Sequence, residues 1–254
     1  MPQILGIPLY DGDVDSAVAE VMATCQSDQP PRSWCISATD AHGLVHAREN
    51  PEFAALLRGF HMVLPDGQPS VWLGRLKGAR RMRRCFGPDF FASVMRASAS
   101  HARVGHFLCG GLPGVAERLA VACREKFANT HVVGVHCPPL RPLNDDEVIA
   151  LARTITASGA QIVWIGISSP KQEMLAARLA PLLRVHFIVT VGAAFDLHTD
   201  RVPRPPAWAE SLGLAWAYRL YKEPRRLWRR YLHTVPRFVA YNALDVARGR
   251  FFED

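Results

Sequence analysis

The sequence predicts an α/β fold: a parallel sheet covered by helices on both faces, followed by a basic helical C-terminal segment. Short apolar runs alternate with helical patterns over most of the chain, an order typical of parallel sheets. Apolar residues make up 49% of the 254 residues, enough for a sizeable core. After about residue 200 the composition shifts towards Arg, Trp, Tyr and Pro. We therefore expect a core of residues 1–200 and an appendage of residues 201–254.

The strands are predicted from short runs, several rich in Val and Ile and most too short for helices. They cover residues 34–37, 61–64, 103–108, 131–135, 160–167 and 186–191. Apolar residues at helical spacing predict helices at residues 51–60, 113–127, 145–157 and 170–183. Ligands of such sheets bind beyond the carboxyl ends of the strands, so the loops that follow the strands are the first candidates for a site.

The charge balance favours an anionic partner. The chain carries 30 Lys and Arg against 23 Asp and Glu, a net charge of +7 with an isoelectric point near 9.4. A phosphate ligand, a nucleic acid or an acidic membrane surface would fit. No apolar run approaches the roughly 18 residues of a transmembrane helix, and the first residues lack the features of a secretory signal. We expect a soluble protein made in the cytosol.

No pattern in the sequence predicts a metal site. The six cysteines never form a CxxC pair and sit among apolar or mixed neighbours, as buried reduced thiols do. His42 and His136 have no second ligand at metal spacing and fit core or turn positions. Asp11-Gly12-Asp13 has the form of a DxD metal motif, but it precedes the main strands and is ordinary loop material.

A helix is predicted to begin at Pro224, because proline is favoured in the first turn. It places apolar and aromatic residues on one side and arginines around the others: Leu227, Trp228, Tyr231 and Leu232 against Arg225, Arg226, Arg229 and Arg230. Such a helix suits a phosphate-rich membrane surface. A helix docked on the core with a solvated basic face explains the same pattern.

Two of the loops that follow strands contain turns suited to ligand binding or catalysis. The Gly-rich turn of residues 110–114 leads into a helix, which favours phosphate binding through backbone N–H groups, although a plain strand–helix turn has the same spacing. It is neither a GxGxxG nor a P-loop motif. Asp66, in a Pro-Asp-Gly sequence, fits a simple turn, and its place beyond a buried strand also makes it a candidate general base.

Several stretches resemble the WecG/TagA/CpsF family of bacterial glycosyltransferases over nearly the whole chain. In order they are DAHG (40–43) with ARENPEF (47–53), LPDG (64–67), GPDF (87–90), GGLPGVAE (110–117), GISSPKQE (166–173), GAAFD (192–196) with RVPRPPAW (201–208), and GLAWAYRL (213–220) with EPRR (223–226). Each stretch alone is weak, whereas their common order is specific.

The resemblance implies a Rossmann-like core, a UDP-sugar donor and an acceptor carried on a polyprenyl diphosphate. It implies transfer with inversion, without a DxD-bound metal or another cofactor, in the synthesis of wall polymer, common antigen, capsule or exopolysaccharide. It also implies a peripheral enzyme on the anionic inner face of the bacterial cytoplasmic membrane, where the appendage helps it dock.

The same resemblance assigns catalytic residues. The proposed base of the family corresponds to Asp66. A threonine of its first loop corresponds to Ala38, so Thr39 is the candidate to replace it, next to Asp40. The appendage arginines match this sequence at three positions, where they would stabilise the departing diphosphate: Arg219, Arg226 and Arg229.

The donor is assigned to the glycine turn and to the loops after the later strands. The turn should receive the diphosphate, and Gln172, Glu173 and Asp196 are suited to bind a ribose or base edge. Lys171 is equally a phosphate contact or a solvated lysine at a helix start. The full predicted set is Gly110, Gly111, Pro113, Gly114, Gly166, Pro170, Lys171, Gln172, Glu173 and Asp196.

Two other classes of protein compete with this interpretation. A nucleotide- or nucleic-acid-binding protein without transferase activity explains the charge and the Arg-rich helix, but not the loops at residues 65–67 and 170–173, and no nucleic-acid motif is present. A nucleotide-dependent oxidoreductase explains the sheet, but the GxGxxG motif is missing. We expect no nucleic-acid partner. The sugar, the acceptor hydroxyl and the oligomeric state stay open, and a homo-oligomer is compatible with the sequence.

Overall fold

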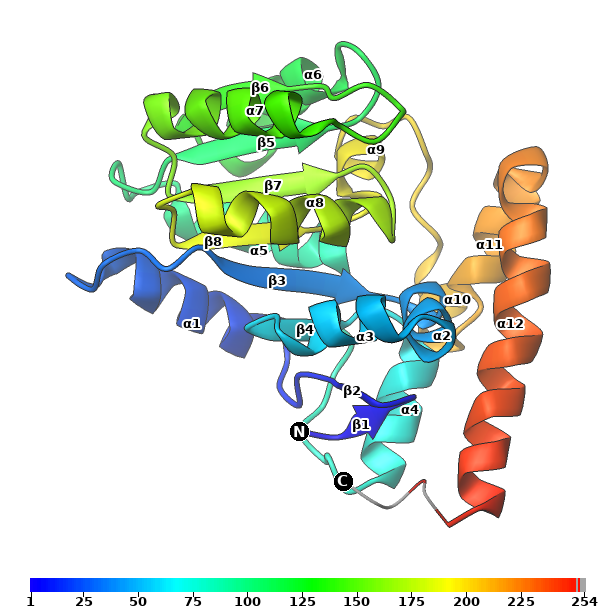
Figure 1. The fold of residues 1–254 in the computed structure, drawn as a ribbon. Helices are drawn as coiled ribbons and strands as arrows, with labels where there is room; N and C mark the ends of the chain where they lie inside the picture. The colour runs from blue at the N-terminus through cyan, green and yellow to red at the C-terminus, as the bar shows by residue number, and fades with distance from the viewer. Residues whose placement is uncertain (250, 252–254) are drawn as a thin grey trace.

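A six-stranded parallel sheet forms the centre of the computed structural model, which describes residues 1–249 and 251 (Figure 1). Its strands are β3 (Trp34–Thr39), β4 (Met62–Pro65), β5 (His106–Gly110), β6 (Val132–His136), β7 (Ile162–Gly166) and β8 (Phe187–Thr190). They lie in the order β4-β3-β8-β7-β5-β6, and each neighbouring pair is parallel. The predicted strands are therefore confirmed, with their ends shifted by up to a few residues.

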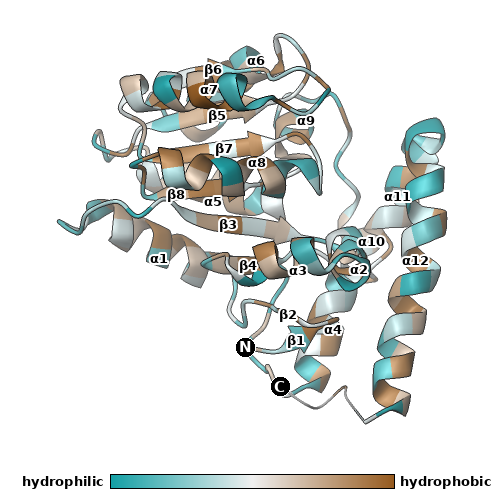
Figure 2. Cartoon of the chain, in the orientation of Figure 1, coloured by the Kyte–Doolittle hydropathy of each residue, from teal (hydrophilic) through white to brown (hydrophobic). Residues whose placement is uncertain are grey.

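Helices cover both faces of this sheet, as predicted. One face packs on α1 (Val14–Gln26), α5 (Gly87–Ser98) and α6 (Val115–Phe127), and the other on α7 (Asp145–Ser158) and α8 (Lys171–Leu179) with the 3-10 turn Ala180–Leu182. Figure 2 shows hydrophobic residues along β7 and β8, between helices of mixed character. Strands buried on both faces are apolar almost throughout, which is why short apolar runs located them.

A third apolar cluster lies beside the sheet, under the N-terminal hairpin. The hairpin pairs β1 (Gln3–Ile4) with β2 (Ile7–Pro8) antiparallel. It packs with α2 (Ala41–Glu49), α3 (Pro51–Arg58) and α4 (Gln68–Leu76). Among the five helices α1 to α5, the sequence predicted only α3.

Asp13 caps α1, since its carboxylate accepts a hydrogen bond from the N–H of Ser16 at 2.9 Å. The Asp11-Gly12-Asp13 sequence is therefore a helix start. All six cysteines are free, and five of them are buried, as predicted.

The winding of the sheet reverses between β5 and β7. β5 leads to β6 on one side of this point, and β7 leads to β8 on the other. The last residues of the two strands, Gly110 and Gly166, are paired. A Cβ atom on Gly110 would lie 2.6 Å from the carbonyl oxygen of Gly166, so the close approach of the two backbones requires glycine here. Open α/β sheets bind ligands beyond such a reversal.

The appendage folds back onto the core. After α9 (Ala194–His198) it forms α10 (Ala207–Ser211), α11 (Ala215–Lys222) and α12 (Pro224–Ala247), and α12 lies alongside α2 (Figure 1). Phe238 of α12 is only 6% exposed and belongs to the cluster around α2, α3 and α4. Among the described helices, none has the length and apolar character needed to cross a bilayer.

α12 begins at Pro224, as predicted, but its packed side differs from the prediction. Leu227 and Tyr231 are buried, whereas Trp228 is 47% and Leu232 67% exposed. The buried residues follow each other at steps of three or four: Leu227, Tyr231, Thr234, Phe238, Asn242 and Asp245. This stripe is narrower than the predicted apolar side, because α12 contacts the core along a single seam.

Candidate active site

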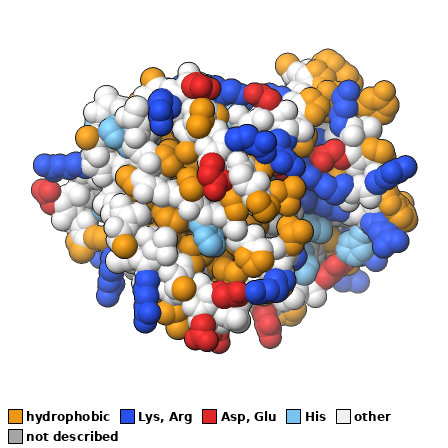
Figure 3. Space-filling view, turned by 90° about the horizontal axis from the view of Figure 1, so that it is seen from above, with side chains coloured by type: hydrophobic (Ala, Val, Ile, Leu, Met, Phe, Trp, Pro, Cys, Tyr) orange, Lys and Arg blue, Asp and Glu red, His pale blue; other side chains and the backbone are white. Residues whose placement is uncertain are grey.

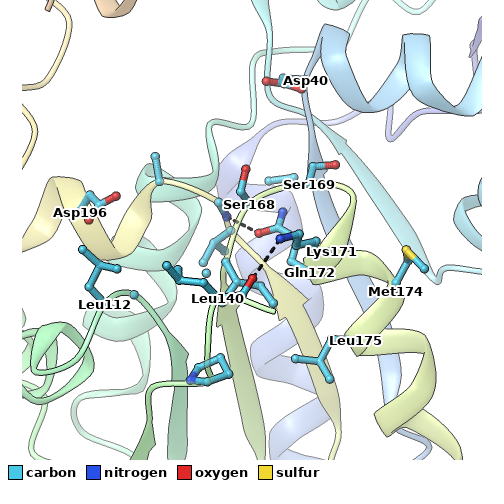
Figure 4. A pocket seen from close by; sticks show the side chains of 18 of the residues that line it. Asp40, Leu112, Leu140, Ser168, Ser169, Lys171, Gln172, Met174, Leu175 and Asp196 are labelled. Carbon is cyan, nitrogen blue, oxygen red and sulfur yellow. Dashed lines mark hydrogen bonds between the residues drawn. The ribbon is translucent and has the colours of Figure 1, made fainter. Parts of the chain in front are cut away.

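A cavity opens beyond the carboxyl ends of the strands. Its volume of about 590 Å³ is large enough for a nucleotide. The ends of five strands, the loop between β6 and α7, and the helices α11 and α12 contribute to its wall. In Figure 4, Asp40, Lys171 and Asp196 lie around the cavity on three different segments of the chain. Of the predicted residues, the cavity is lined by Asp40, Asp66, Gly111, Gly166, Lys171, Gln172, Asp196, Arg219 and Arg226.

Two carboxylates leave the sheet side by side at this cavity. Asp40 follows Thr39 of β3, and Asp66 follows Pro65 of β4, and these two strand residues are in register. Neighbouring strands lie about 4.8 Å apart. The N–H of Asp66 also donates to the carbonyl oxygen of Thr39 at 3.1 Å, so the two turns are joined.

The carboxylate of Asp66 lies at the start of α5, where the N-cap residue Phe86 makes no side-chain cap hydrogen bond. Its Oδ1 accepts a hydrogen bond from the N–H of Gly87 at 3.1 Å, and its carbonyl oxygen accepts one from Nε of Arg84 at 2.7 Å. Burial raises the pKa of Asp66 to about 6; Arg84 opposes this rise, and the Asp40 carboxylate adds to it. Asp66 is therefore mostly ionised at neutral pH and basic enough to accept a proton.

Asp40 is held from three directions. As the cap of α2, its Oδ1 accepts hydrogen bonds from the N–H groups of His42 and Gly43 at 3.0 and 3.1 Å. Its Oδ2 accepts one from Arg230 at 2.7 Å. Burial works against ionisation, but Arg230 and the other donors hold the pKa of Asp40 below its usual value. The two neighbouring carboxyl groups thus have pKa values pushed apart, an arrangement typical of acid–base sites.

The appendage supplies a positive wall opposite these carboxylates. Arg219 comes from α11, and Arg226 and Arg230 come from α12. The sequence interpretation placed Arg230 among the arginines of the basic helix but gave it no role in this site. The sequence feature that could have identified Arg230 is its spacing of four residues from Arg226, because this spacing places both side chains on one face of the helix.

Arg229, which was predicted for this wall, lies outside the cavity. It is exposed, and its guanidinium carbon is 5.2 Å from the centroid of the Trp228 ring. One step along a helix turns the side chain by about 100°, so Arg229 and Arg230 point in different directions.

Only the second and third residues of the glycine turn face the cavity. Gly111 and Leu112 line it, while Gly110 is buried behind them, and Pro113 and Gly114 are exposed outside. Gly111 has a φ of 74°, and a Cβ atom there would lie 2.6 Å from Cβ of Val115. The turn thus requires glycine for its own conformation.

Two serines of the loop after β7 line the cavity, and the sequence interpretation did not select them. Ser168 and Ser169 both lie in the wall, and Ser168 has a φ of 78°. Strained backbone of this kind is concentrated at ligand sites. Gln172 accepts a hydrogen bond from the N–H of Gly192 at 3.1 Å, which ties the loops after β7 and β8 together (Figure 4). Pro170 lies outside the lining residues.

Glu173 lies beneath the cavity and is 1% exposed. Its Oε1 accepts hydrogen bonds from Ser37 at 3.1 Å, Gln172 at 2.9 Å and Thr190 at 3.3 Å. Burial raises its pKa. The carboxyl group therefore braces the strands and loops under the site, on the far side of the cavity wall.

Thr39 belongs to this buried group rather than to the cavity wall. Its hydroxyl lies 2.9 Å from the hydroxyl of Ser37, and it is 3% exposed. Ala38, between them, lines the cavity. Alternate strand residues face opposite sides of a sheet, so Thr39 does not take the place of the side chain missing at Ala38.

An apolar, proline-rich loop forms a further wall that the sequence interpretation missed. It consists of residues 138–143, between β6 and α7. Nζ of Lys171 donates to the carbonyl oxygen of Leu140 at 3.0 Å and so fastens this loop to α8 (Figure 4). This loop follows a strand, as the predicted site loops do. Its position after β6 could therefore have identified it as part of the site.

In the part of the chain that the structure describes, no three His, Cys, Asp or Glu side chains form a group that could hold a metal ion. Guanidinium groups act on both carboxylates: Arg230 and Arg219 lower the pKa of Asp40, and Arg84 and Arg219 oppose the rise in the pKa of Asp66. The cavity therefore combines a proton acceptor with cations that suit phosphate oxygens.

Comparison with known protein families finds a match over nearly the whole chain. The sequence profile of the family described as "Glycosyl transferase WecG/TagA/CpsF family" matches residues 2–250. The match spans the sheet, the cavity and the appendage.

Proposed function

The chain belongs to the WecG/TagA/CpsF family of glycosyltransferases, and from this premise we propose that it moves a sugar, with inversion, from a UDP-sugar to a sugar carried on a polyprenyl diphosphate. The product would be an intermediate of exopolysaccharide, capsule or cell-wall polymer synthesis. The observation that carries the proposal is the position of Asp66: a carboxylate with a raised pKa shares one cavity with three arginines of α11 and α12.

In this mechanism Asp66 is the general base. The acceptor hydroxyl attacks the anomeric carbon of the donor on the face opposite the diphosphate. As the new glycosidic bond forms, the hydroxyl proton passes to the Asp66 carboxylate, and the bond to the diphosphate breaks. A pKa of about 6 leaves Asp66 ionised before the step and able to hold the proton after it. Such a base contributes roughly 10²–10⁴-fold to the rate.

The departing UDP carries the electron pair of the broken bond and needs positive groups around it. Arg219 and Arg226, which line the cavity, suit this role, because a guanidinium fork binds two phosphate oxygens at once. Removing one preorganised donor of this kind typically costs about 3 kcal/mol, or roughly a hundredfold in rate. These cations support a reaction in which no divalent ion is required, which is part of the proposal.

The donor would lie across the reversal of the sheet. Gly111 and Leu112 offer backbone at the diphosphate position, and Gln172 and Asp196 offer polar groups for a ribose or base edge. The apolar loop at residues 138–143 closes the opposite side. Pro113, Gly114, Pro170 and Glu173 act, in this proposal, on the shape of the turns rather than by contact.

The appendage has a second role in the proposal, as a membrane contact. Figure 3 shows Lys and Arg side chains gathered on the side of the molecule where α11 and α12 lie, with hydrophobic side chains beside them. Arg225 and Arg229 are exposed there, as are Trp228 and Leu232. Anionic lipids of an inner leaflet attract such cations by about 1 kcal/mol each. This membrane contact would bring the cavity close to the lipid-linked acceptor.

A donor screen tests this function. The purified protein is incubated with UDP-glucose, UDP-glucuronic acid or UDP-N-acetylmannosamine and a short-chain polyprenyl-diphosphate-sugar acceptor, and products are read by mass spectrometry. We expect one donor to add one sugar mass to the acceptor, with release of UDP. No added mass with any donor, together with salt-matched DNA binding tighter than UDP binding, would refute it.

A further inference from the structure

We propose that Arg230 is a positioning residue of this site: it fixes the Asp40 carboxylate beside Asp66 and so links the arrangement of both carboxylates to the docking of α12. The inference rests on the proposed function of the cavity and adds a residue to it. Neither the motifs of the resemblance nor the sequence interpretation gave Arg230 a role in the site.

The ion pair of Arg230 and Asp40 is short and shielded. Their atoms Nη2 and Oδ2 are 2.7 Å apart, and the two side chains are 22% and 31% exposed. Nε of Arg230 is buried and makes no hydrogen bond in the described structure. Asp40 is therefore the group that orients the guanidinium. Removing one partner of such a pair leaves the other charge buried and uncompensated.

Arg230 is also where the appendage meets the catalytic end of the sheet. In the sequence of α12 it lies between two buried residues, Leu227 and Tyr231, which are 3% and 8% exposed. Its partner Asp40 is the first residue after β3, and the next strand places Asp66 at the equivalent position. A displacement of α12 at this point would release Oδ2 of Asp40, and the carboxylate would then be held only through Oδ1 by the start of α2.

Other contacts dock α12 outside the cavity, so the effect of Arg230 is separable from docking. Thr234 bonds to His42 at 3.1 Å, and the hydroxyl of Tyr241 donates to Glu49 at 2.8 Å. Arg237 pairs with Glu49 at 3.1 Å. The variant Arg237→Gln is therefore a matched control: it removes an arginine–carboxylate pair between the same two helices, away from the site.

Hydrogen exchange of the free protein tests the positioning directly. In Arg230→Gln, the amide protons of His42 and Gly43, which are held by Asp40, should exchange about tenfold faster than in the wild type. Amides of α12 should keep their protection, and Arg237→Gln should leave the His42 and Gly43 amides unchanged. Unchanged exchange of these two amides in Arg230→Gln would overturn the proposal.

Kinetics then separate positioning from donor binding. Arg230→Gln should lower kcat about 10- to 100-fold with little change in the donor KM, and Arg230→Lys should recover part of the loss, because an ammonium group also pairs with a carboxylate. The double variant Asp40→Asn/Arg230→Gln should be no slower than the slower single variant, since both act through one pair. A raised KM at unchanged kcat, or additive losses, would refute the positioning role.

The two proposals fail in different ways. A wild-type protein that transfers no sugar refutes the proposed function, whereas hydrogen exchange requires no turnover and still decides what Arg230 does to Asp40.

Discussion

Asp40 and Asp66 stand side by side at the ends of paired strands, yet they differ in their readiness to take a proton. Arg230 keeps the pKa of Asp40 low, whereas burial raises the pKa of Asp66 to about 6. The difference follows from their partners, because the carboxylate of Asp66 accepts one backbone N–H while that of Asp40 also faces a guanidinium group. In the proposed mechanism the two adjacent carboxyl groups therefore have different roles: Asp40 stays charged, and Asp66 exchanges the proton.

The variant Asp66→Asn should lower kcat by roughly 10²–10⁴-fold, the usual contribution of a general base. The asparagine keeps an oxygen for the hydrogen bond from Gly87, so the start of α5 is retained. Initial rates of sugar transfer at saturating donor measure the effect. Asp11→Asn, at an exposed carboxylate in the loop before α1, is the control and should retain full activity.

The stability of Asp66→Asn shows whether lost activity reflects chemistry or unfolding. Burial raises the pKa of Asp66 from 3.8 to about 6 in the folded protein, so the unfolded chain gives up this proton more easily. Wild-type stability should therefore fall as the pH rises from about 4 to about 6, and the asparagine variant escapes that loss. We expect Asp66→Asn to melt at or above the wild-type temperature at pH 7.5, with the difference shrinking towards pH 4. A lower melting temperature at pH 7.5 would assign the lost activity to unfolding.

The pH profile of kcat/KM should follow the same group. Activity should fall as the pH drops through about 6, because protonated Asp66 cannot accept the acceptor proton. Burial, Arg84, Asp40, the Gly87 N–H and Arg219 set this pKa. Asp40→Asn removes a neighbouring negative charge and should shift the acidic limb to lower pH, whereas Arg84→Gln removes a cation and should shift it to higher pH. If the acidic limbs of the Asp40→Asn and Arg84→Gln profiles do not shift in opposite directions, Asp66 is not the titrating base.

The sequence predicted the parts of this site that depend on local pattern. The strands are buried on both faces and short, so apolar runs located them and placed Asp66 and the loop of residues 166–173 beyond their ends. The family resemblance selected Asp66 as the base. No local pattern gives the pKa difference between Asp40 and Asp66, because it depends on a contact between residues 40 and 230.

Thr39 and Arg229, two predicted residues that do not line the cavity, differ from the neighbouring residues that do in the direction of the side chain. Thr39 and Ala38 differ by one position in a strand, which decides whether a side chain faces the buried cluster or the cavity. Arg229 and Arg230 differ by one position in a helix, and the rotation of α12 against α2 decides which one enters the site. These orientations are set by tertiary packing, which the linear pattern does not contain.

Removal of residues 223–254 should abolish most activity while leaving the sheet folded. The six strands and helices α1 to α9 all lie before residue 200, whereas Arg226 and Arg230 are removed. The loss of Phe238 from its apolar cluster, about 3–5 kcal/mol by analogy with Phe→Ala changes, should lower the melting temperature by about 10 °C. Circular dichroism, thermal melting and transfer rates measure the three effects, with Leu244→Ala, at a 45% exposed residue of α12, as the control that keeps all three. A truncated protein with full activity would contradict the role of the appendage.

Binding to anionic vesicles should depend on the exposed side of α12 and weaken as salt is added. Arg225 and Arg229 are exposed there, and each cation near an anionic surface contributes about 1 kcal/mol. The double variant Arg225→Gln/Arg229→Gln should thus bind about 30-fold more weakly in a sedimentation assay at low salt. Arg124→Gln/Arg153→Gln, at exposed arginines of α6 and α7, has the same change in net charge and should bind like the wild type.

Salt separates electrostatic docking from insertion of apolar side chains. Screening over about 8–10 Å at physiological ionic strength weakens the attraction of Arg225 and Arg229 to lipid headgroups, but not the burial of Trp228 or Leu232 in the bilayer. If binding persists in high salt and is lost in Trp228→Ala, the apolar side chains rather than the arginines hold the protein at the membrane. Equal loss of binding in both arginine double variants would mean that net charge, and not the surface of α12, draws the protein to the lipid.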